Sequence, residues 1–218
     1  AGDEKDTIIV SGSPRSGTTW LMEILETLPG YRSIFEPLHR DWFEEVRTIQ
    51  LEGYPHPYLP PQVEKPELEE YLRRVLRGDV AGRVDMRPRL EAIFKFLRSS
   101  KIIVKFIRAN RLLPWILRRF RVRATYLVLR HPCATVASQL SRRWVLPNPR
   151  SWAPFVRELV DHDPEARDVL LKIIERPEDP AEVWALTWAL DYYIPLSQPR
   201  PHPWRVVVYE RLLLDGES

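Results

Sequence analysis

The fold of this chain is constrained most by one short segment, Ser11–Trp20, which reads Ser-Gly-Ser-Pro-Arg-Ser-Gly-Thr-Thr-Trp. Apolar residues before it predict a strand over 7–10, and apolar residues at helical spacing after it predict a helix over 18–28. Small residues let the intervening backbone fold around an anion, with N–H groups directed at it. The helix N-terminus adds a favourable dipole. The segment therefore predicts a phosphate-binding turn between a strand and a helix.

The same segment nearly matches the pattern G-x-x-x-x-G-K-[ST] of proteins that bind nucleoside triphosphates. Gly12, Gly17 and Thr19 occupy matching positions, but Thr18 stands where the pattern has lysine. That lysine normally contacts the β- and γ-phosphates, so its replacement argues against γ-phosphoryl transfer. Arg15 supplies a positive charge from within the loop instead.

The rest of the chain alternates between short apolar segments and helical patterns. This alternation predicts an α/β fold, a parallel central sheet flanked by helices with a P-loop-containing nucleotide-binding architecture, in one domain over residues 1–218. Strands are expected at 7–10, 101–107, 124–129 and 205–208, and helices at 18–28, 67–77, 89–98, 111–120, 133–143, 152–174 and 180–195. The Pro-rich stretch 36–66 is expected to pass irregularly over the site.

Composition narrows the classes of function. Hydrophobic residues make up 44% of the chain and charged residues 29%, as in soluble globular proteins. The net charge of +3 suits an anionic ligand but is too small to indicate nucleic acid. The histidines lack the spacing of metal ligands, so no metal site is expected.

The sequence carries little information about the location of the protein or about cysteine chemistry. The sequence has no run of 18 apolar residues and no signal peptide, so we expect no membrane segment and a cytoplasmic location. A domain cut from an anchored precursor is the alternative. Cys133 is the single cysteine, which allows no intrachain disulfide, and it is expected to be a small buried residue at a helix start.

A second group of residues follows the strand expected at 124–129. Arg130 ends that strand, Pro132 suits a helix start, and Ser138 lies in the helix that follows. An arginine at a strand end and a serine on the next helix can converge on one phosphate. Taken alone, the pair can equally serve a surface ion pair and a solvated helix face.

The two groups together resemble the sulfotransferases that use 3′-phosphoadenylyl sulfate (PAPS). The run P-R-S-G-T-T-W is similar to their 5′-phosphosulfate loop, and R-x-P-x-x-x-x-x-S is similar to their 3′-phosphate motif. The resemblance implies PAPS as donor and PAP as product. The donor-binding residues that it implies are Pro14, Arg15, Ser16, Gly17, Thr18, Thr19, Trp20, Arg130 and Ser138. Trp20 matches the position that contacts adenine, although a tryptophan in such a helix is often a core residue.

Sulfuryl transfer also needs a group that accepts the proton of the attacking hydroxyl. The small-molecule branch of the family uses a histidine in a K-T-H segment, but here that place reads Lys105-Phe106-Ile107-Arg108. Ile34–Leu38 instead resembles the F-E-P segment of carbohydrate sulfotransferases, and the tyrosylprotein branch also places a glutamate after the loop. The resemblance therefore implies Glu36 as general base and a hydroxyl acceptor, carbohydrate or similar.

Alternatives to this assignment remain open. Glu36 can be a structural partner of Arg15 or Arg32, and His39 and His131 are rival bases. The catalytic set implied is Arg15, Glu36 and Lys105. Lys105 would neutralise the leaving phosphate or the sulfuryl oxygens, as Arg108 also can, although a surface cation is an equal alternative.

The resemblance extends to the late segment Val206–Leu212, which is similar to a strand followed by Y-E-x-L and is expected to be structural. Members of the family continue beyond this point, so the chain is expected to lack their C-terminal part. Two other classes are kept, a P-loop nucleotide kinase-like enzyme and a non-catalytic nucleotide-binding module.

Overall fold

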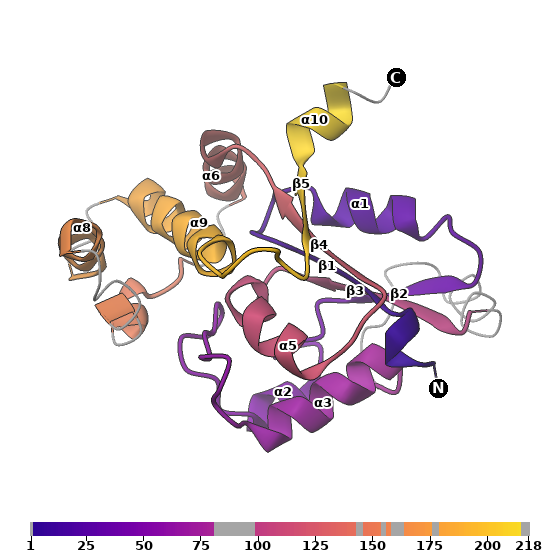
Figure 1. Ribbon diagram of the computed structural model, residues 1–218. Helices are drawn as coiled ribbons and strands as arrows, with labels where there is room; N and C mark the ends of the chain where they lie inside the picture. The colour runs from indigo at the N-terminus through magenta and orange to yellow at the C-terminus, as the bar shows by residue number, and fades with distance from the viewer. Residues whose placement is uncertain are drawn as a thin grey trace.

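Five parallel strands form the central sheet of the computed structural model, which describes residues 2–80, 99–142, 146–153, 156–157, 164–175 and 179–214 (Figure 1). The strands are β1 (Ile8–Gly12), β2 (Tyr31–Phe35), β3 (Lys101–Phe106), β4 (Ala124–Leu129) and β5 (Arg205–Val208). Their order in the sheet is β2-β3-β1-β4-β5, and every neighbouring pair is parallel. The expected α/β class with a parallel central sheet is thus confirmed.

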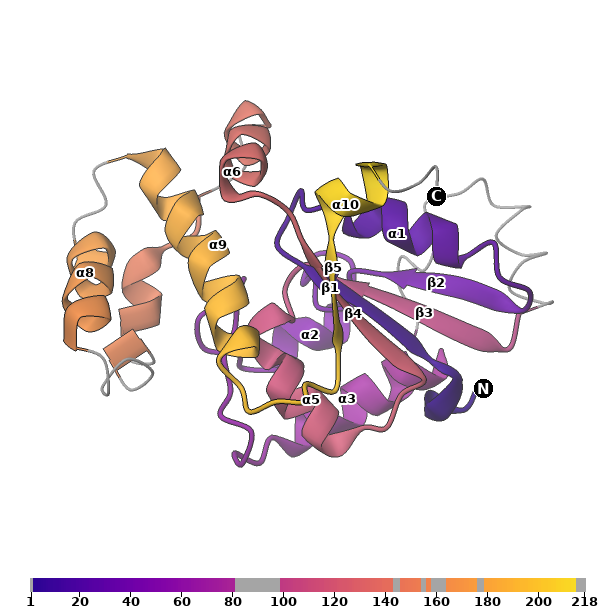
Figure 2. The ribbon, with the colours of Figure 1, turned by 45° about the horizontal axis from the view of Figure 1, so that its top comes forward.

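Helices cover both faces of this sheet. The described helices of the structure are α1 (Thr18–Leu25), α2 (Glu44–Thr48), α3 (Pro66–Arg77), α5 (Leu113–Arg119), α6 (Pro132–Ser141), α8 (Pro164–Glu175), α9 (Pro180–Leu196) and α10 (Tyr209–Leu214), with short 3₁₀ helices η1 (Glu4–Asp6), η2 (Asn110–Leu112) and η3 (Pro149–Trp152). Figure 2 shows α1 and α10 on one side of the sheet and α2, α3 and α5 on the other. Across the residues that the structure describes, no helix is long and apolar enough to cross a membrane.

The alternation of side chains along β1 explains why both faces are covered. Ile9 packs into the core beneath α3 and α5, whereas Ile8 and Val10 pack on the opposite side with Leu21 and Met22 of α1. Successive side chains of a strand point to opposite faces. A strand that is buried at every position, as β1 is, therefore needs a helix layer on each side.

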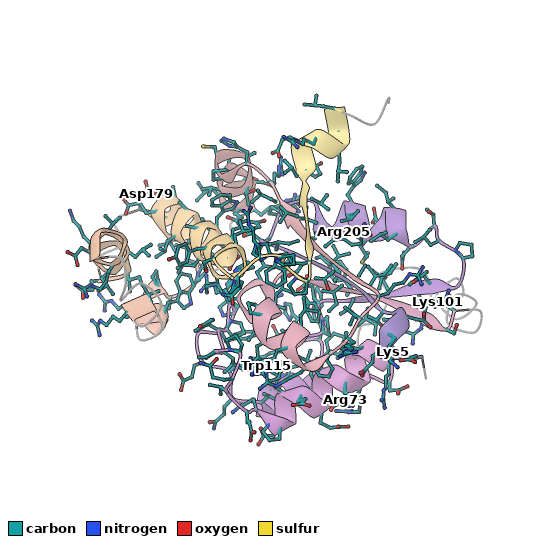
Figure 3. The ribbon with its side chains drawn as sticks, viewed as in Figure 1. Lys5, Arg73, Lys101, Trp115, Asp179 and Arg205 are labelled. Atoms are coloured by element: carbon teal, nitrogen blue, oxygen red, sulfur yellow. The ribbon has the colours of Figure 1, made fainter. Side chains whose placement is uncertain are left out.

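Helix α9 lies beyond the carboxyl ends of the central strands, where Figures 1 and 2 both place it. Asp179 caps its start, labelled in Figure 3, by accepting a hydrogen bond of 2.7 Å from the backbone N–H of Ala181. Near the other end of the helix, the buried Tyr192 donates a hydrogen bond from its hydroxyl to the Val128 carbonyl of β4. This helix thereby brings residues near the end of the chain to the end of β1.

Strand β2 was not predicted from the sequence. Tyr31–Phe35 contains Arg32 and Ser33, which are buried although polar. The carboxylate of Glu26 accepts a hydrogen bond of 2.9 Å from the Ser33 N–H, and Arg32 donates one of 3.0 Å to the Gly78 carbonyl. These long-range partners make a mixed segment acceptable as an edge strand, and they leave no periodic signal in the sequence.

Other boundaries also differ. Helix α1 ends at Leu25 rather than at 28, because hydrogen bonds from Thr27 to Ile24 and from Leu28 to Leu25 tighten the backbone into turns. The helix expected at 89–98 lies outside the described residues. Within the expected helix 152–174, the structure describes the end of η3 and most of α8, and much of the stretch between them lies outside the described residues.

Candidate functional site

The loop between β1 and α1, residues 13–17, adopts a conformation that its sequence dictates. Gly17 has a φ of 95°, and a Cβ there would lie 2.3 Å from the ring of Tyr209. Gly12 is equally constrained, since a Cβ would lie 2.6 Å from Ser16 Oγ and 2.7 Å from the Val128 carbonyl oxygen. Only glycine fits either position. The loop therefore turns tightly into the N-terminus of α1, whose first N–H groups have no partner within the helix.

Two residues other than glycine have a positive φ among those described, Arg15 at 72° and Glu36 at 53°. Each such residue costs about 1–3 kcal/mol, and such strain concentrates at functional sites. Arg15 lies in the β1–α1 loop with an exposed side chain, and Glu36 directly follows β2. A positive φ thus occurs at two of the three residues, Arg15 and Glu36 but not Lys105, to which the resemblance assigns catalysis.

Three elements hold the β1–α1 loop from behind. The backbone N–H of Ser13 donates to the hydroxyl of Tyr192 (3.1 Å), which in turn donates to the Val128 carbonyl (2.6 Å). Gln139 of α6 donates from Nε2 to the Pro14 carbonyl at 2.9 Å. Contacts from α9, β4 and α6 therefore fix the backbone of the loop in place.

The second group of sequence-predicted residues meets the first at this loop. Arg15 Nε donates to Ser138 Oγ at 3.0 Å, and Arg130 Nη1 donates to the Arg15 carbonyl at 3.0 Å. The guanidinium carbon of Arg130 also lies 5.1 Å from the centre of the Tyr209 ring. Arg15, Arg130 and Ser138, far apart in the sequence, thus come together at the carboxyl ends of β1 and β4.

Glu36 is the centre of a second cluster beside the loop. Its side chain is 1% exposed, and its Oε1 lies 2.8 Å from Lys105 Nζ. Its Oε2 lies 3.2 Å from Arg108 Nη1 and accepts a hydrogen bond of 3.1 Å from the Ile107 N–H. Two cations and one N–H group therefore stabilise the carboxylate. The ion-pair partners of Glu36 are the cations at the end of β3, where the sequence had offered Arg15 or Arg32.

One pocket of about 1220 Å³ joins these groups. The sequence-predicted residues in its lining are Arg15, Gly17, Thr18, Thr19, Trp20, Glu36, Lys105 and Arg130. Pro14 and Ser16 also belong to the loop, but their side chains are buried and do not line the pocket. Ser138 contacts Arg15 but is not among the described residues that line the pocket. The structure therefore brings both predicted clusters to one cavity.

Trp20 is half-buried and lines this pocket, so it is not the core residue that a helical tryptophan often is. Its ring meets the ring of Tyr209 edge to face, with 5.9 Å between centres. Tyr209 itself lines the pocket and covers Gly17. The sequence had treated the Tyr209 segment as structural, because nothing local shows that it returns to the β1–α1 loop.

His39 and His131, the alternative candidates for the general base, differ in their position relative to the pocket. His39 lines the pocket, stacks on Trp42 with 4.1 Å between ring centres, and accepts a hydrogen bond at Nδ1 from the Asp41 N–H. Burial and the charge of Arg108 lower the pKa of His39. His131 is exposed, and its backbone N–H donates to Glu210. Cys133 is also exposed, so the expectation that it is buried was wrong.

A buried polar cluster that the sequence did not reveal lies behind the pocket. Asp191 Oδ1 is 3.0 Å from Arg111 Nε and 3.2 Å from His56 Nδ1, and all three side chains are buried. Burial alone would raise the pKa of Asp191, but His56 and Arg111 outweigh it and the pKa falls below its usual value. Burial lowers the pKa of His56, which favours its neutral form. The three residues come from segments far apart in the chain, so no spacing signals them.

The lowered pKa of His56 predicts how stability depends on pH. The unfolded chain, where histidine titrates near its ordinary value of about 6.5, binds more protons than the folded protein below that pH. We therefore expect the free energy of unfolding to fall as the pH is lowered from about 6.5, with a slope of up to about 1.4 kcal/mol per pH unit. Urea unfolding at a series of pH values measures this slope.

The variant His56→Asn keeps a donor toward Asp191 but does not titrate, so it should lose most of the slope between pH 6.5 and 5. His39→Asn is the matched comparison: the pKa of His39 is lowered in the same direction, but His39 is only partly buried, so this variant should lose a smaller part of the slope. A slope that His56→Asn leaves intact would show that another group controls the acid response.

The described residues contain no cluster of three or more His, Cys, Asp or Glu side chains placed to hold a metal ion. No protein-family model matches the chain, and no curated protein matches it either. The residues of the pocket are therefore the basis for assigning its function.

Proposed function

We propose that the protein is a sulfotransferase that moves the sulfuryl group of PAPS to an acceptor hydroxyl, within a P-loop type of nucleotide-binding architecture. One observation carries this proposal. Arg15, Arg130 and Glu36, which follow three different parallel strands, line one pocket at the carboxyl edge of the sheet. That edge is where α/β sheets bind their ligands.

The donor half of the proposal rests on the β1–α1 loop. Free N–H groups at the start of α1 and the exposed Arg15 suit the 5′-phosphosulfate. Arg130 and Ser138, held against Arg15, suit the 3′-phosphate. The half-buried ring of Trp20 offers a face on which adenine can stack.

The chemical half rests on the Glu36 cluster. In an in-line displacement the acceptor oxygen forms a bond to sulfur while the bond from sulfur to the bridging phosphate oxygen breaks. The electron pair of that bond leaves with PAP, and the acceptor proton passes to the Glu36 carboxylate. Such reactions depend mainly on positioning and on stabilising charge. Lys105 and Arg108, already against Glu36, supply positive charge where sulfuryl oxygens would lie.

Ligand binding tests the donor assignment. PAP should raise the melting temperature of the protein, because a ligand that binds only the folded state stabilises it. 5′-AMP, which lacks the 3′-phosphate, should bind more weakly, and Arg130→Ala should remove most of that preference. Thermal shift and calorimetric titration with PAP, 5′-AMP and ATP measure these differences.

The same titration separates the proposal from its rivals. Tighter binding of ATP than of PAP would support a kinase-like enzyme. PAP binding without transfer of labelled sulfate from PAPS to any of a panel of glycans, phenols, peptides and amines would support a non-catalytic module. Equal binding of PAP and 5′-AMP by the unmutated protein would overturn the 3′-phosphate assignment.

A further inference from the structure

The buried Arg111 joins two segments that lie next to residues of the pocket lining. It lies in η2 with 1% of its side chain exposed, and its guanidinium uses three donors. Nε donates to Asp191 (3.0 Å), Nη1 to the His56 carbonyl (3.3 Å) and Nη2 to the Thr187 carbonyl (3.4 Å). Its planar group also covers the Trp152 ring at 4.4 Å. The buried guanidinium of Arg111 thus connects α9 to the segment around His56 by hydrogen bonds.

The α9 end of this connection leads to the β1–α1 loop. Asp191 is adjacent to Tyr192, whose hydroxyl holds the N–H of Ser13. A shift of Asp191 would therefore move the loop that carries Arg15.

The contacts of Arg111 with His56 and Trp152 lead to the turn at 53–56, which contributes to the same pocket as Glu36. The backbone N–H of His56 donates to the Gly53 carbonyl, and Trp152 Nε1 donates to that same carbonyl at 3.3 Å. Tyr54 and Pro55, within this turn, line the pocket. The Tyr54 hydroxyl accepts a hydrogen bond of 3.3 Å from the Arg40 N–H. The turn at 53–56 is thus fixed beside the segment that carries Glu36 and His39.

We propose that Arg111 is a positioning residue that sets the distance between the β1–α1 loop and the Tyr54–Pro55 wall, and so aligns the acceptor with the donor. This inference rests on the proposed function. An in-line displacement tolerates little misplacement, and an error of about 1 Å can cost about 10²-fold in rate. Arginine suits the task because its planar fork fixes three acceptors at once, whereas lysine provides one flexible ammonium group.

The variant Arg111→Lys tests this directly, because it keeps a positive charge near Asp191 but loses the fork. We expect the acceptor KM to rise and kcat to fall by about tenfold or more, while the Kd for PAP changes less than about twofold. In the protein without added ligand, hydrogen exchange at the His56 N–H should accelerate. A purely structural role would lower the PAP-binding fraction and kcat together and leave the acceptor KM unchanged.

Arg119→Lys is the matched control. Arg119 likewise holds carbonyls of the same long connection, those of Pro61 at 2.8 Å and Val63 at 2.6 Å, but these residues do not belong to the described lining of the pocket. Its kcat and acceptor KM should stay at the wild-type values. Trp152→Phe is the second test variant, because it removes one of the two hydrogen bonds to the Gly53 carbonyl and leaves Asp191 unchanged. It should show the kinetic pattern of Arg111→Lys in weaker form.

Each possible result either supports or overturns the positioning role of Arg111. Wild-type KM, kcat and exchange at 53–56 in Arg111→Lys, or in Trp152→Phe if the first variant does not fold, would overturn the positioning role. If the wild-type protein neither binds PAP nor transfers sulfate, the proposed function fails. In that case exchange at 53–56 still decides whether Arg111 holds this wall of the pocket.

Discussion

Replacing Arg15 with alanine is expected to lower turnover with PAPS by about 10²–10³-fold, with little change in acceptor binding. The exposed guanidinium lies at the turn into α1. In the proposed reaction it would face the bridging oxygen, which would gain negative charge as its bond to sulfur breaks. Removing a contact that strengthens only in the transition state lowers kcat rather than affinity. Initial rates at several acceptor concentrations separate the two quantities.

The lysine variant is the control for charge. Arg15→Lys should recover part of the lost rate, since it keeps the positive charge but cannot make a forked contact. It should also weaken the contact that Arg15 Nε makes with Ser138. Full activity in Arg15→Ala would refute the role in transfer and leave Arg15 as a structural part of the loop.

Glu36→Gln is expected to lower turnover by about 10²-fold or more while the affinity for PAP stays nearly unchanged. The amide has the shape of the carboxylate and can still accept from the Ile107 N–H, but it cannot take the acceptor proton. His39→Ala is the matched control, because His39 lines the same pocket and should be dispensable. Loss of transfer in His39→Ala with transfer retained in Glu36→Gln would assign the base to His39.

The contacts of Glu36 call for one further comparison. If Glu36 acts only by holding Lys105 and Arg108, then Lys105→Met should lower turnover as much as Glu36→Gln does, and the double variant should be no worse than either. If Glu36 takes the proton, the double variant should be slower than both single variants. This cycle separates proton transfer from positioning.

The part of the fold that sequence could predict is the part with strong local periodicity. Strands β1, β3 and β4 each contain a run of three apolar residues, and α3 carries Leu68, Leu72 and Val75 on one buried face. Strand β2 was missed because Arg32 and Ser33 are buried through partners at Gly78 and Glu26. Those partners are known only once the chain has folded, so propensity alone could not find the strand.

The same distinction holds for the candidate site. Arg15, Glu36 and Arg130 each follow a strand or lie in a loop with a recognisable motif, so the sequence could predict that they share one edge of the sheet. The Arg111–Asp191 pair has no such motif. It joins η2 to α9 across 80 residues of sequence, and side-chain pairs so far apart leave no periodic trace in a single sequence.

The contact between Gly17 and Tyr209 has a consequence for the order of assembly. The β1–α1 loop is among the first segments of this chain, but its cover comes from the first residue of α10, and its support comes from Tyr192 of α9. Parallel pairing of β1 with β3 and β4 already requires long loops to close, which slows folding. During synthesis from the N-terminus, β5 and α10 must therefore emerge before the surroundings of the loop are complete. We expect the pocket to form only after these elements have docked, although the β1–α1 motif is translated before them.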